Sequence, residues 1–318
     1  MSVDEDKRTV TTVTLHTITW FLTTLLSLTG NSLICVAFYN NRRLLTITNF
    51  FVLSLTLIDL IAASFGYPFN TISSGLRRWP FGHNFCQFNG FLSHFWTVVS
   101  IHMLALTAMN RYFCIIKPRF YSILFTREKT ARSIILVWLC TLTGGLALTF
   151  ATPLVFRWHP YYLFCQIESS ETLPAPTSTI LTVYTLSLIS LTLFCYAAVY
   201  LAIKRHNSAI IPSLTGPRDH QANNINSHEI QASRILLIAV LVFFVCWIPA
   251  TVVSTIERVA RQDVLSFWQS FDTLVFACTS WINPIIYVIM SRAMRKEIIK
   301  ILHCRKGNWW THTTWVKL

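Results

Sequence analysis

Seven long apolar stretches constrain this chain more than any other feature of its sequence. A helix needs roughly 20 mostly apolar residues to cross a bilayer, because every backbone N–H and C=O must be satisfied within the segment. The stretches that meet this requirement are residues 15–39, 46–68, 86–112, 132–154, 177–203, 230–256 and 266–290. Only 12% of the residues are charged, which leaves too little polar surface for a soluble globule. The sequence therefore predicts an all-α membrane protein, a seven-transmembrane helix bundle over residues 15–290.

The distribution of Lys and Arg predicts the orientation of this bundle. Seven of the 26 basic residues lie in the N-terminal tail and the loops on its side, which leaves 19 for the opposite side. Because cytosolic loops carry the excess, we expect residues 1–14 to be an extracellular tail of a multi-pass plasma-membrane protein. The net charge of +13 lies largely in residues 111–132 and 292–306. Their place beside the inner leaflet favours anionic lipid and an acidic cytosolic partner over nucleic acid.

The nine cysteines divide unequally between the two predicted sides. Only Cys86 and Cys165 fall on the outer side, which is oxidising, so we expect them to form a disulfide. Two free thiols are the alternative.

The residues after the seventh stretch predict a short peripheral helix. Residues 291–303 interleave basic and apolar side chains, which is typical of an amphipathic helix on the inner leaflet. Cys304 follows this helix, as a palmitoylation site or a plain thiol, and residues 304–318 are expected to form a cytoplasmic tail.

Asp59 is an ionisable residue in the middle of the second apolar stretch. It lies roughly 20 Å from the start of that stretch at about 1.5 Å per residue, near the bilayer midplane. Asn31, Ser100 and Asn283 fall at similar depth. Their oxygen atoms suit a small cation such as sodium, or a water cluster. The alternative is a neutral Asp59 that holds helices together by hydrogen bonds.

Arg111 and Glu229 stand at the inner ends of the third and sixth stretches. An ion pair between them would hold these ends together, and its rupture would open a crevice on the cytosolic side. Arg111 could instead extend toward lipid headgroups.

Two prolines interrupt predicted helices. Pro249 follows Trp247 in the sixth stretch, and Pro284 follows Asn283 in the seventh. A proline inside a helix removes a hydrogen bond and kinks the helix, which provides a hinge, although a purely structural role is also open.

These residues together resemble the rhodopsin-like G protein-coupled receptors over residues 15–303. The resemblance rests on motifs that recur in order through every stretch: Gly30-Asn31, Leu55 with Asp59, Cys86, Arg111-Tyr112, Trp138, Tyr196, Cys246-Trp247-x-Pro249 and Asn283-Pro284-x-x-Tyr287. It implies that a ligand bound between the outer helix halves moves the sixth helix outward, so that Arg111 meets a heterotrimeric G protein. Arrestin is a further implied partner, and Asp59, Ser100 and Asn283 would form the sodium site of the family.

The chain departs from the family pattern at several positions. Asn110 replaces the usual acid before Arg111, which predicts a looser resting state and is shared with melatonin receptors. Leu188 stands where the fifth helix usually has a proline, and Thr279 stands where an Asn is usual near the ion site. Pro284 distinguishes the chain from melatonin receptors, so the subfamily stays open.

The resemblance also bears on the ligand. Opsins attach retinal to a lysine in the seventh helix, where this chain has Ala277, so covalent retinal is not expected. Amine receptors use an acid where this chain has Ser93. The candidate pocket residues lie on shared faces of the third and seventh helices, together with Trp247: Ser93, His94, Thr97, Asp272, Thr273 and Phe276. Asp272 could bind a ligand cation or pair with Arg258 or Arg261, and the ligand could be a lipid, a small polar molecule or a short peptide.

Three other classes of membrane protein are alternatives to a receptor. A transporter or channel predicts an internal inverted repeat, and the sequence shows none. A metalloenzyme needs clustered ligands, whereas His94 and His102 are about 80° apart around a helix. An enzyme is therefore not expected. A receptor-like scaffold that does not couple to G protein remains the alternative.

Overall fold

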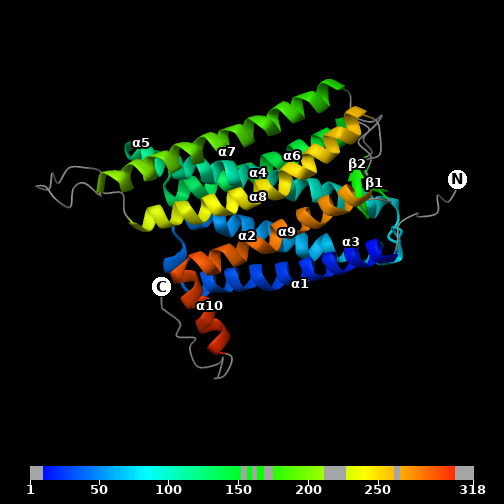
Figure 1. The fold of residues 1–318 in the computed structure, drawn as a ribbon, viewed down its shortest axis with the longest axis horizontal. Helices are drawn as coiled ribbons and strands as arrows, with labels where there is room; N and C mark the ends of the chain where they lie inside the picture. Colours follow the sequence, from blue (N-terminus) through cyan, green and yellow to red (C-terminus); the bar gives the residue numbers. More distant parts are fainter. Residues whose placement is uncertain are drawn as a thin grey trace, which may run out of the picture.

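The chain forms an elongated bundle of helices with a two-stranded hairpin at one end (Figure 1). The computed structural model describes residues 10–151, 156–159, 163–167, 175–210, 227–260 and 266–304. Its elements in chain order are α1 (Val10–Asn40), η1 (Arg42–Leu44), α2 (Ile47–Phe65), α3 (Tyr67–Leu76), α4 (His83–Ile116), α5 (Pro118–Leu124), α6 (Arg127–Ala151), β1 (Phe156–His159), β2 (Phe164–Ile167), α7 (Ala175–Ile210), α8 (Ser227–Ala260), α9 (Ser266–Met290) and α10 (Arg292–Cys304).

The predicted seven-helix bundle is confirmed, with changes at its ends. Within the described residues, six helical segments are long and apolar enough to cross a membrane, counting α2 and α3 as one, and α9 supplies a seventh helix. The first helix begins at Val10, so residues 10–14 are helical where the sequence predicted an extracellular tail. Helix α5 and the β1–β2 hairpin were not predicted.

The second predicted span is divided at Gly66. A Cβ atom on Gly66 would lie 2.2 Å from Cη2 of Trp96, so only glycine allows α4 to approach this closely. Pro68 lies in the first turn of α3, where its missing N–H breaks no helical hydrogen bond. The glycine and the proline therefore end α2 and begin α3.

Helices α1 and α9 approach closely at Gly30. A Cβ atom on Gly30 would lie 3.1 Å from Cβ of Pro284, tighter than an ordinary contact. Gly144 on α6 is the contrasting case, because a Cβ atom there meets nothing within 4 Å.

We expect Gly30→Leu to lower the thermal unfolding temperature of the purified protein by several degrees. The added side chain must push α1 from α9, and overpacking of this kind costs about 1–3 kcal/mol. Gly144→Leu adds the same side chain on the open face of α6 and should leave the unfolding temperature nearly unchanged. Equal effects of the two substitutions would show that the Gly30 contact is unimportant.

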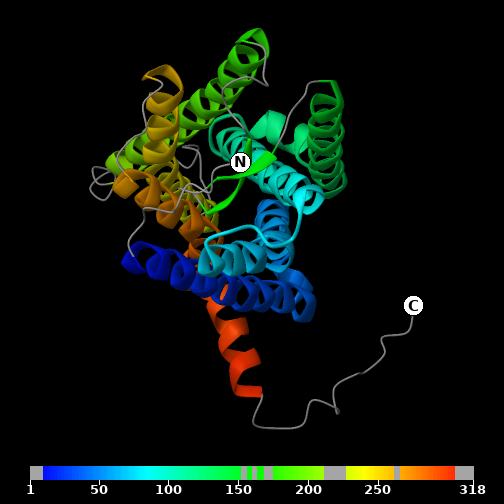
Figure 2. The same cartoon turned by 90° about the vertical axis from the view of Figure 1, so that its right-hand side faces the viewer.

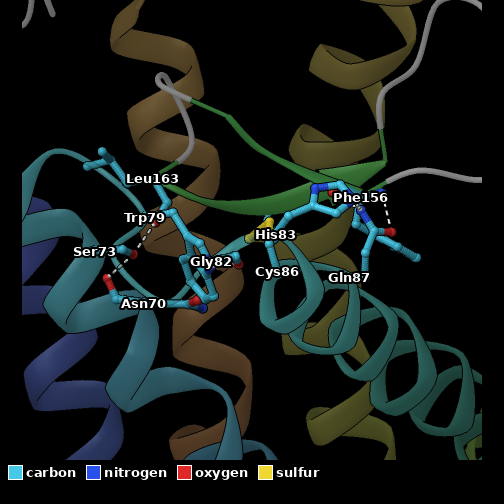
Figure 3. The surroundings of a disulfide bond; sticks show 10 residues. Asn70, Ser73, Trp79, Gly82, His83, Cys86, Gln87, Phe156 and Leu163 are labelled. Carbon is cyan, nitrogen blue, oxygen red and sulfur yellow. Dashed lines mark hydrogen bonds between the residues drawn. A yellow bond between two sulfur atoms is a disulfide. The ribbon is translucent and has the colours of Figure 1, made fainter.

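The hairpin lies across one end of the bundle (Figure 2). Strands β1 and β2 are antiparallel, with Trp158 opposite Cys165, and Cys165 forms the predicted disulfide with Cys86 at the start of α4. Figure 3 shows this bond among the loops and helix ends that surround it. The hydroxyl of Ser73 donates to the backbone oxygen of Leu163 at 3.2 Å, which ties the hairpin turn to α3. We call this end of the molecule the hairpin end.

Helix α10 leaves the opposite end of the bundle at a steep angle (Figure 1). Met294 and Ile298 are buried against the bundle, whereas Ile299 and Leu302 are exposed. The carboxylate of Glu297 accepts a hydrogen bond from Nδ2 of Asn41 at 3.2 Å, which fixes α10 to the end of α1. We call this the α10 end.

Candidate functional site

Asp59 is buried in α2 and hydrogen-bonded to α9. Its Oδ1 accepts from the hydroxyl of Ser280 at 2.9 Å, and its Oδ2 accepts from Nδ2 of Asn283 at 3.4 Å. Asn31 of α1 does not bond the carboxylate, but its Nδ2 donates to the backbone oxygen of Ser280 at 3.1 Å. The Asp59 cluster therefore joins α1, α2 and α9.

A tyrosine extends this cluster toward the hairpin end. The hydroxyl of Tyr67 lies 2.5 Å from Oγ of Ser280. Because the single hydroxyl proton of Ser280 is donated to Asp59, Tyr67 must donate to Ser280. The ring of Tyr67 in turn packs against Trp20 and Trp96 at 5.4 and 6.0 Å between centroids. Sequence reasoning missed Tyr67 and Ser280.

A small cavity of about 20 Å³ lies beside Asp59. This volume holds about one water molecule or one small ion. Its lining is formed by Leu55, Asp59, Ser100, Leu104, Phe243, Thr279 and Asn283. The hydroxyl of Ser100 donates to the backbone oxygen of Trp96 at 2.8 Å, which leaves its oxygen able to accept or to ligate. Carboxylate, hydroxyl and amide oxygens fit a small hard cation.

Arg111 is fully buried near the α10 end of α4 and links three helices. Its Nη1 lies 2.7 Å from a carboxylate oxygen of Glu229 in α8, and its Nη2 donates to the hydroxyl of Thr48 in α2. Nε donates to Oδ1 of Asn110 at 3.0 Å, so an uncharged amide takes the place of a second carboxylate. Thr48 was missed by sequence reasoning, because a threonine in an apolar helix gives no signal by itself.

Several groups surround this ion pair. The thiol of Cys114 donates to the same carboxylate oxygen of Glu229 at 3.4 Å. Tyr121 of α5 lies nearby. Burial raises the pKa of its phenol, although Arg111 acts in the opposite direction, so the phenol stays neutral near pH 7. The hydroxyls of Tyr196 and Tyr287 are buried without a hydrogen-bond partner among the described residues. Such groups are ready to bond to each other, to water or to Arg111 after a rearrangement.

The α7 and α8 helices carry the remaining predicted switch positions. The ring of Trp247 stacks on that of Phe243 at 5.2 Å, one turn nearer the α10 end. Pro249 lies within the bounds of α8, but its side chain is outside the described residues. Helix α7 runs without a break through Leu188, and Tyr184 bonds Nε2 of His102 at 2.5 Å. A direct α4–α7 contact thus lies next to the position of the missing proline.

The predicted pocket residues are only partly placed. Ser93 and Thr97 are half-buried on α4, and the exposed ring of His94 meets the ring of Phe156 edge-on at 5.8 Å. The side chains of Asp272, Thr273 and Phe276 are outside the described residues, as is that of Cys304, the predicted palmitoylation site. The structure therefore brings His94 to the hairpin and leaves the α9 half of the predicted pocket undescribed.

Known proteins match this chain along most of its length. Residues 30–287 match the family model described as 7 transmembrane receptor (rhodopsin family). A GQ-coupled rhodopsin of Mizuhopecten yessoensis is 26% identical over 86% of this chain and 56% of its own length. The RYamide receptor of Drosophila melanogaster is 26% identical over 88% of this chain and 61% of the receptor. The melatonin receptor type 1A of Gallus gallus is 26% identical over 92% of this chain and 80% of the receptor.

A solved structure has the same fold. The crystal structure of squid rhodopsin superposes with a TM-score of 0.79 at 20% identity, covering 96% of this chain and 85% of the rhodopsin chain. The chain spans about half the length of the first opsins that it matches, between 41% and 62%. The family match covers the Asp59 cluster, Arg111 and the α9 motif together. The chain therefore belongs to the rhodopsin family of seven-transmembrane receptors.

Proposed function

We propose that this chain is a G protein-coupled receptor that converts the binding of an extracellular ligand into activation of a heterotrimeric G protein. The observation that carries the proposal is the burial of Arg111 between α2, α4 and α8, with Glu229 as its ionic partner. A buried arginine is costly unless it is paired, so the position of Arg111 depends on its bonds to Glu229 and Thr48. Its exposure after α8 moves would create a cationic site for an acidic partner.

The separation of α8 from α4 is the proposed switch. The Arg111–Glu229 bond and the Cys114 contact to Glu229 link these helices at the α10 end. The Glu229 side chain is 40% exposed, so solvent weakens its attraction to Arg111. A small amount of free energy from ligand binding would therefore suffice to break the ion pair. The stacked Phe243 and Trp247 lie on the same helix, and Pro249 provides the hinge. Tyr196 and Tyr287 would then supply hydroxyls around the released guanidinium.

The proposed setting is the plasma membrane, with the hairpin end outside and the α10 end in the cytosol. The disulfide at the hairpin end requires an oxidising compartment. Basic residues of α10, including Arg295, Lys296 and Lys300, suit the anionic inner leaflet. Arrestin is proposed to use the same cytosolic surface.

A sodium ion is the proposed occupant of the Asp59 cavity. Asp59, Ser100, Thr279 and Asn283 would hold it through oxygen atoms, and its charge would offset that of the carboxylate. Asn31 would act indirectly, by fixing α9 through Ser280. The ion would favour the state in which these helices stay together.

We expect NaCl, compared with choline chloride at equal ionic strength, to raise the thermal unfolding temperature of the wild type. A cation at ten times its dissociation constant adds about 1.4 kcal/mol of stability. Asp59→Asn removes the charge while keeping the shape, so the two salts should then give the same unfolding temperature. An undiminished sodium effect in Asp59→Asn would rule out this cavity as the site.

The named relatives do not share one ligand, since they include opsins, a RYamide receptor and melatonin receptors. Ala277 lacks the amine that a retinal Schiff base requires, so we propose a freely diffusing ligand. The side chains of Ser93 and Thr97 are only half-buried, so a lipid, a small polar molecule or a short peptide could contact them.

The test is guanine-nucleotide exchange on a panel of G protein subtypes, with the chain expressed in cells. We expect a signal above that of untransfected cells with at least one subtype. Silence across the panel, with the chain shown at the cell surface, favours the second candidate, a receptor-like scaffold. Asn110 beside Arg111 and the unbroken α7 at Leu188 are the observations that support this candidate.

A further inference from the structure

We propose that Gln231 of α8 is a positioning residue that holds the α10 end of α8 against the end of α9. Its Nε2 donates to the backbone oxygen of Met290, the last residue of α9, at 3.1 Å. We call this bond the α9 latch. Together with the Arg111–Glu229 pair it would retain α8 at rest, through one neutral bond and one ionic bond. The inference rests on the proposed receptor function and concerns the control of its switch.

The latch and the ion pair hold opposite sides of α8. Glu229 and Gln231 are two positions apart, which is about 200° around a helix at about 100° per residue. Glu229 accordingly meets Arg111 of α4, whereas Gln231 reaches α9. Helices α8 and α9 run side by side along the bundle (Figure 1). A movement of α8 away from both neighbours must therefore break both bonds.

The latch uses the chemistry of a helix end. The last four carbonyls of a helix have no N–H partner within it, and they carry the negative end of the helix dipole. At the end of α9, Nη1 of Arg295 donates to the backbone oxygen of Ile289 at 2.8 Å, and Gln231 bonds the next carbonyl. The N–H of Ser291 bonds the oxygen of Tyr287 at 3.0 Å and closes the last turn. Side chains from α10 and α8 thus cap α9 together, so a shift of α9 would also loosen α8.

A neutral latch has a property that the ion pair lacks. Salt screens partly exposed charges, and the side chain of Glu229 is 40% exposed. Neither the amide of Gln231 nor the carbonyl of Met290 carries a net charge, so ionic strength should change their bond little. One neutral hydrogen bond typically changes an equilibrium constant by about twofold to tenfold. Loss of the latch should therefore raise the population of released α8 by about this factor.

The thiol of Cys114 can report the release of α8 without any G protein. It is partly buried and donates to a carboxylate oxygen of Glu229 at 3.4 Å, so it lies against α8. Departure of α8 would uncover it. The experiment alkylates the purified full chain with N-ethylmaleimide and follows the peptide that contains Cys114 by mass spectrometry over time. Cys140, which is exposed on α6, is the internal reference.

Three substitutions of the exposed Gln231 separate the hydrogen bond from other effects. Gln231→Ala removes the donor and should speed the alkylation of Cys114 about twofold to tenfold. Gln231→Glu keeps the shape but places a carboxylate against the negative end of α9, so the increase should be at least as large. Gln231→Lys restores a donor, and the rate should return to that of the wild type. Cys140 should be alkylated at the same rate in all four proteins, because the fold is unchanged.

The control position is Arg234, which is exposed about one turn further along α8. Arg234→Gln lowers the net charge by one, as Gln231→Glu does, and should leave the alkylation of Cys114 unchanged. An unchanged rate in Gln231→Ala, or a rate in Gln231→Lys as high as in Gln231→Ala, would overturn the proposal. An equal increase in Arg234→Gln would overturn it as well.

Nucleotide exchange then separates the latch from the proposed function. Faster alkylation of Cys114 in Gln231→Ala, with no exchange on any G protein subtype, would support the latch and contradict the receptor function. Unchanged alkylation in Gln231→Ala, with a basal signal that rises in Glu229→Ala, would support the function and overturn the latch.

Discussion

Arg111→Ala is expected to abolish G protein activation while leaving the chain at the cell surface. The substitution removes the cation that would face the G protein, and it also leaves Glu229 without its ionic partner. Glu229 is 40% exposed on its side chain, so water can solvate the orphaned carboxylate and the fold should survive. The measurement is nucleotide exchange normalised to surface expression, with a loss of at least about 100-fold, equivalent to about 2.7 kcal/mol.

Two other substitutions separate charge from geometry at this site. Arg111→Lys keeps the charge but loses the planar group that bonds Glu229, Thr48 and Asn110 at once, so most of the activity should still be lost. Thr48→Ala removes one bond only and should retain signalling. If Arg111→Ala signals like the wild type at equal surface density, Arg111 does not have the assigned role.

Loss of the Cys86–Cys165 disulfide is expected to have the second largest effect. The bond closes a loop across 79 positions of sequence separation and holds β2 on α4. Removal of a native disulfide typically costs about 2–5 kcal/mol. Cys86→Ser should therefore reduce surface expression severely, and Cys165→Ser should reduce it to the same extent.

The double substitution identifies the cause of this loss. If the two cysteines act only through their shared bond, Cys86→Ser/Cys165→Ser should be no worse than either single change. Cys140→Ser, at an exposed position on α6, should be close to neutral. Losses that add between Cys86 and Cys165 would argue against the bond in the mature protein.

Most of the fold followed from one property of the sequence. Apolar length alone located the seven helices, because a bilayer leaves the backbone no other way to satisfy its hydrogen bonds. The break at Gly66 did not follow, since it depends on Trp96, a residue 30 positions away on another helix. Strands β1 and β2 are only four residues each, too short for a periodic pattern to be seen. Their position is set by the disulfide and by Gln87 instead.

The site was predictable where a residue is unusual for a membrane span. Asp59, Arg111 and Asn283 were found because charged and amide groups need a reason to lie in a bilayer. Ser280 and Tyr67 were missed, because serine and tyrosine occur in such helices for many reasons. One signal could have found Ser280: it precedes Asn283 by three residues and so shares its helix face. Tyr67 gave no such signal, because it is the first residue of α3 and lies just after the break at Gly66, which the sequence did not predict.

Asn110 shows how a departure from the family pattern acts physically. Its amide oxygen bonds Arg111 as a carboxylate would, so the geometry is kept while one negative charge is lost. A bond from the guanidinium to a neutral amide lacks the Coulomb attraction between two full charges that an ion pair has. Among the described residues, Glu229 is therefore the ionic partner that holds Arg111 in the resting state.

The most direct test of this account is basal G protein activation by Glu229→Ala beside the wild type, at matched surface density. The control is Glu128→Ala. This substitution removes an exposed ion pair between Glu128 and Arg132, which lies within α6 and does not link two helices. We predict that Glu229→Ala raises the basal signal severalfold, while Glu128→Ala leaves it unchanged. A basal signal that stays equal in all three proteins, or falls in Glu229→Ala, would contradict the claim that the Arg111–Glu229 pair holds the receptor at rest.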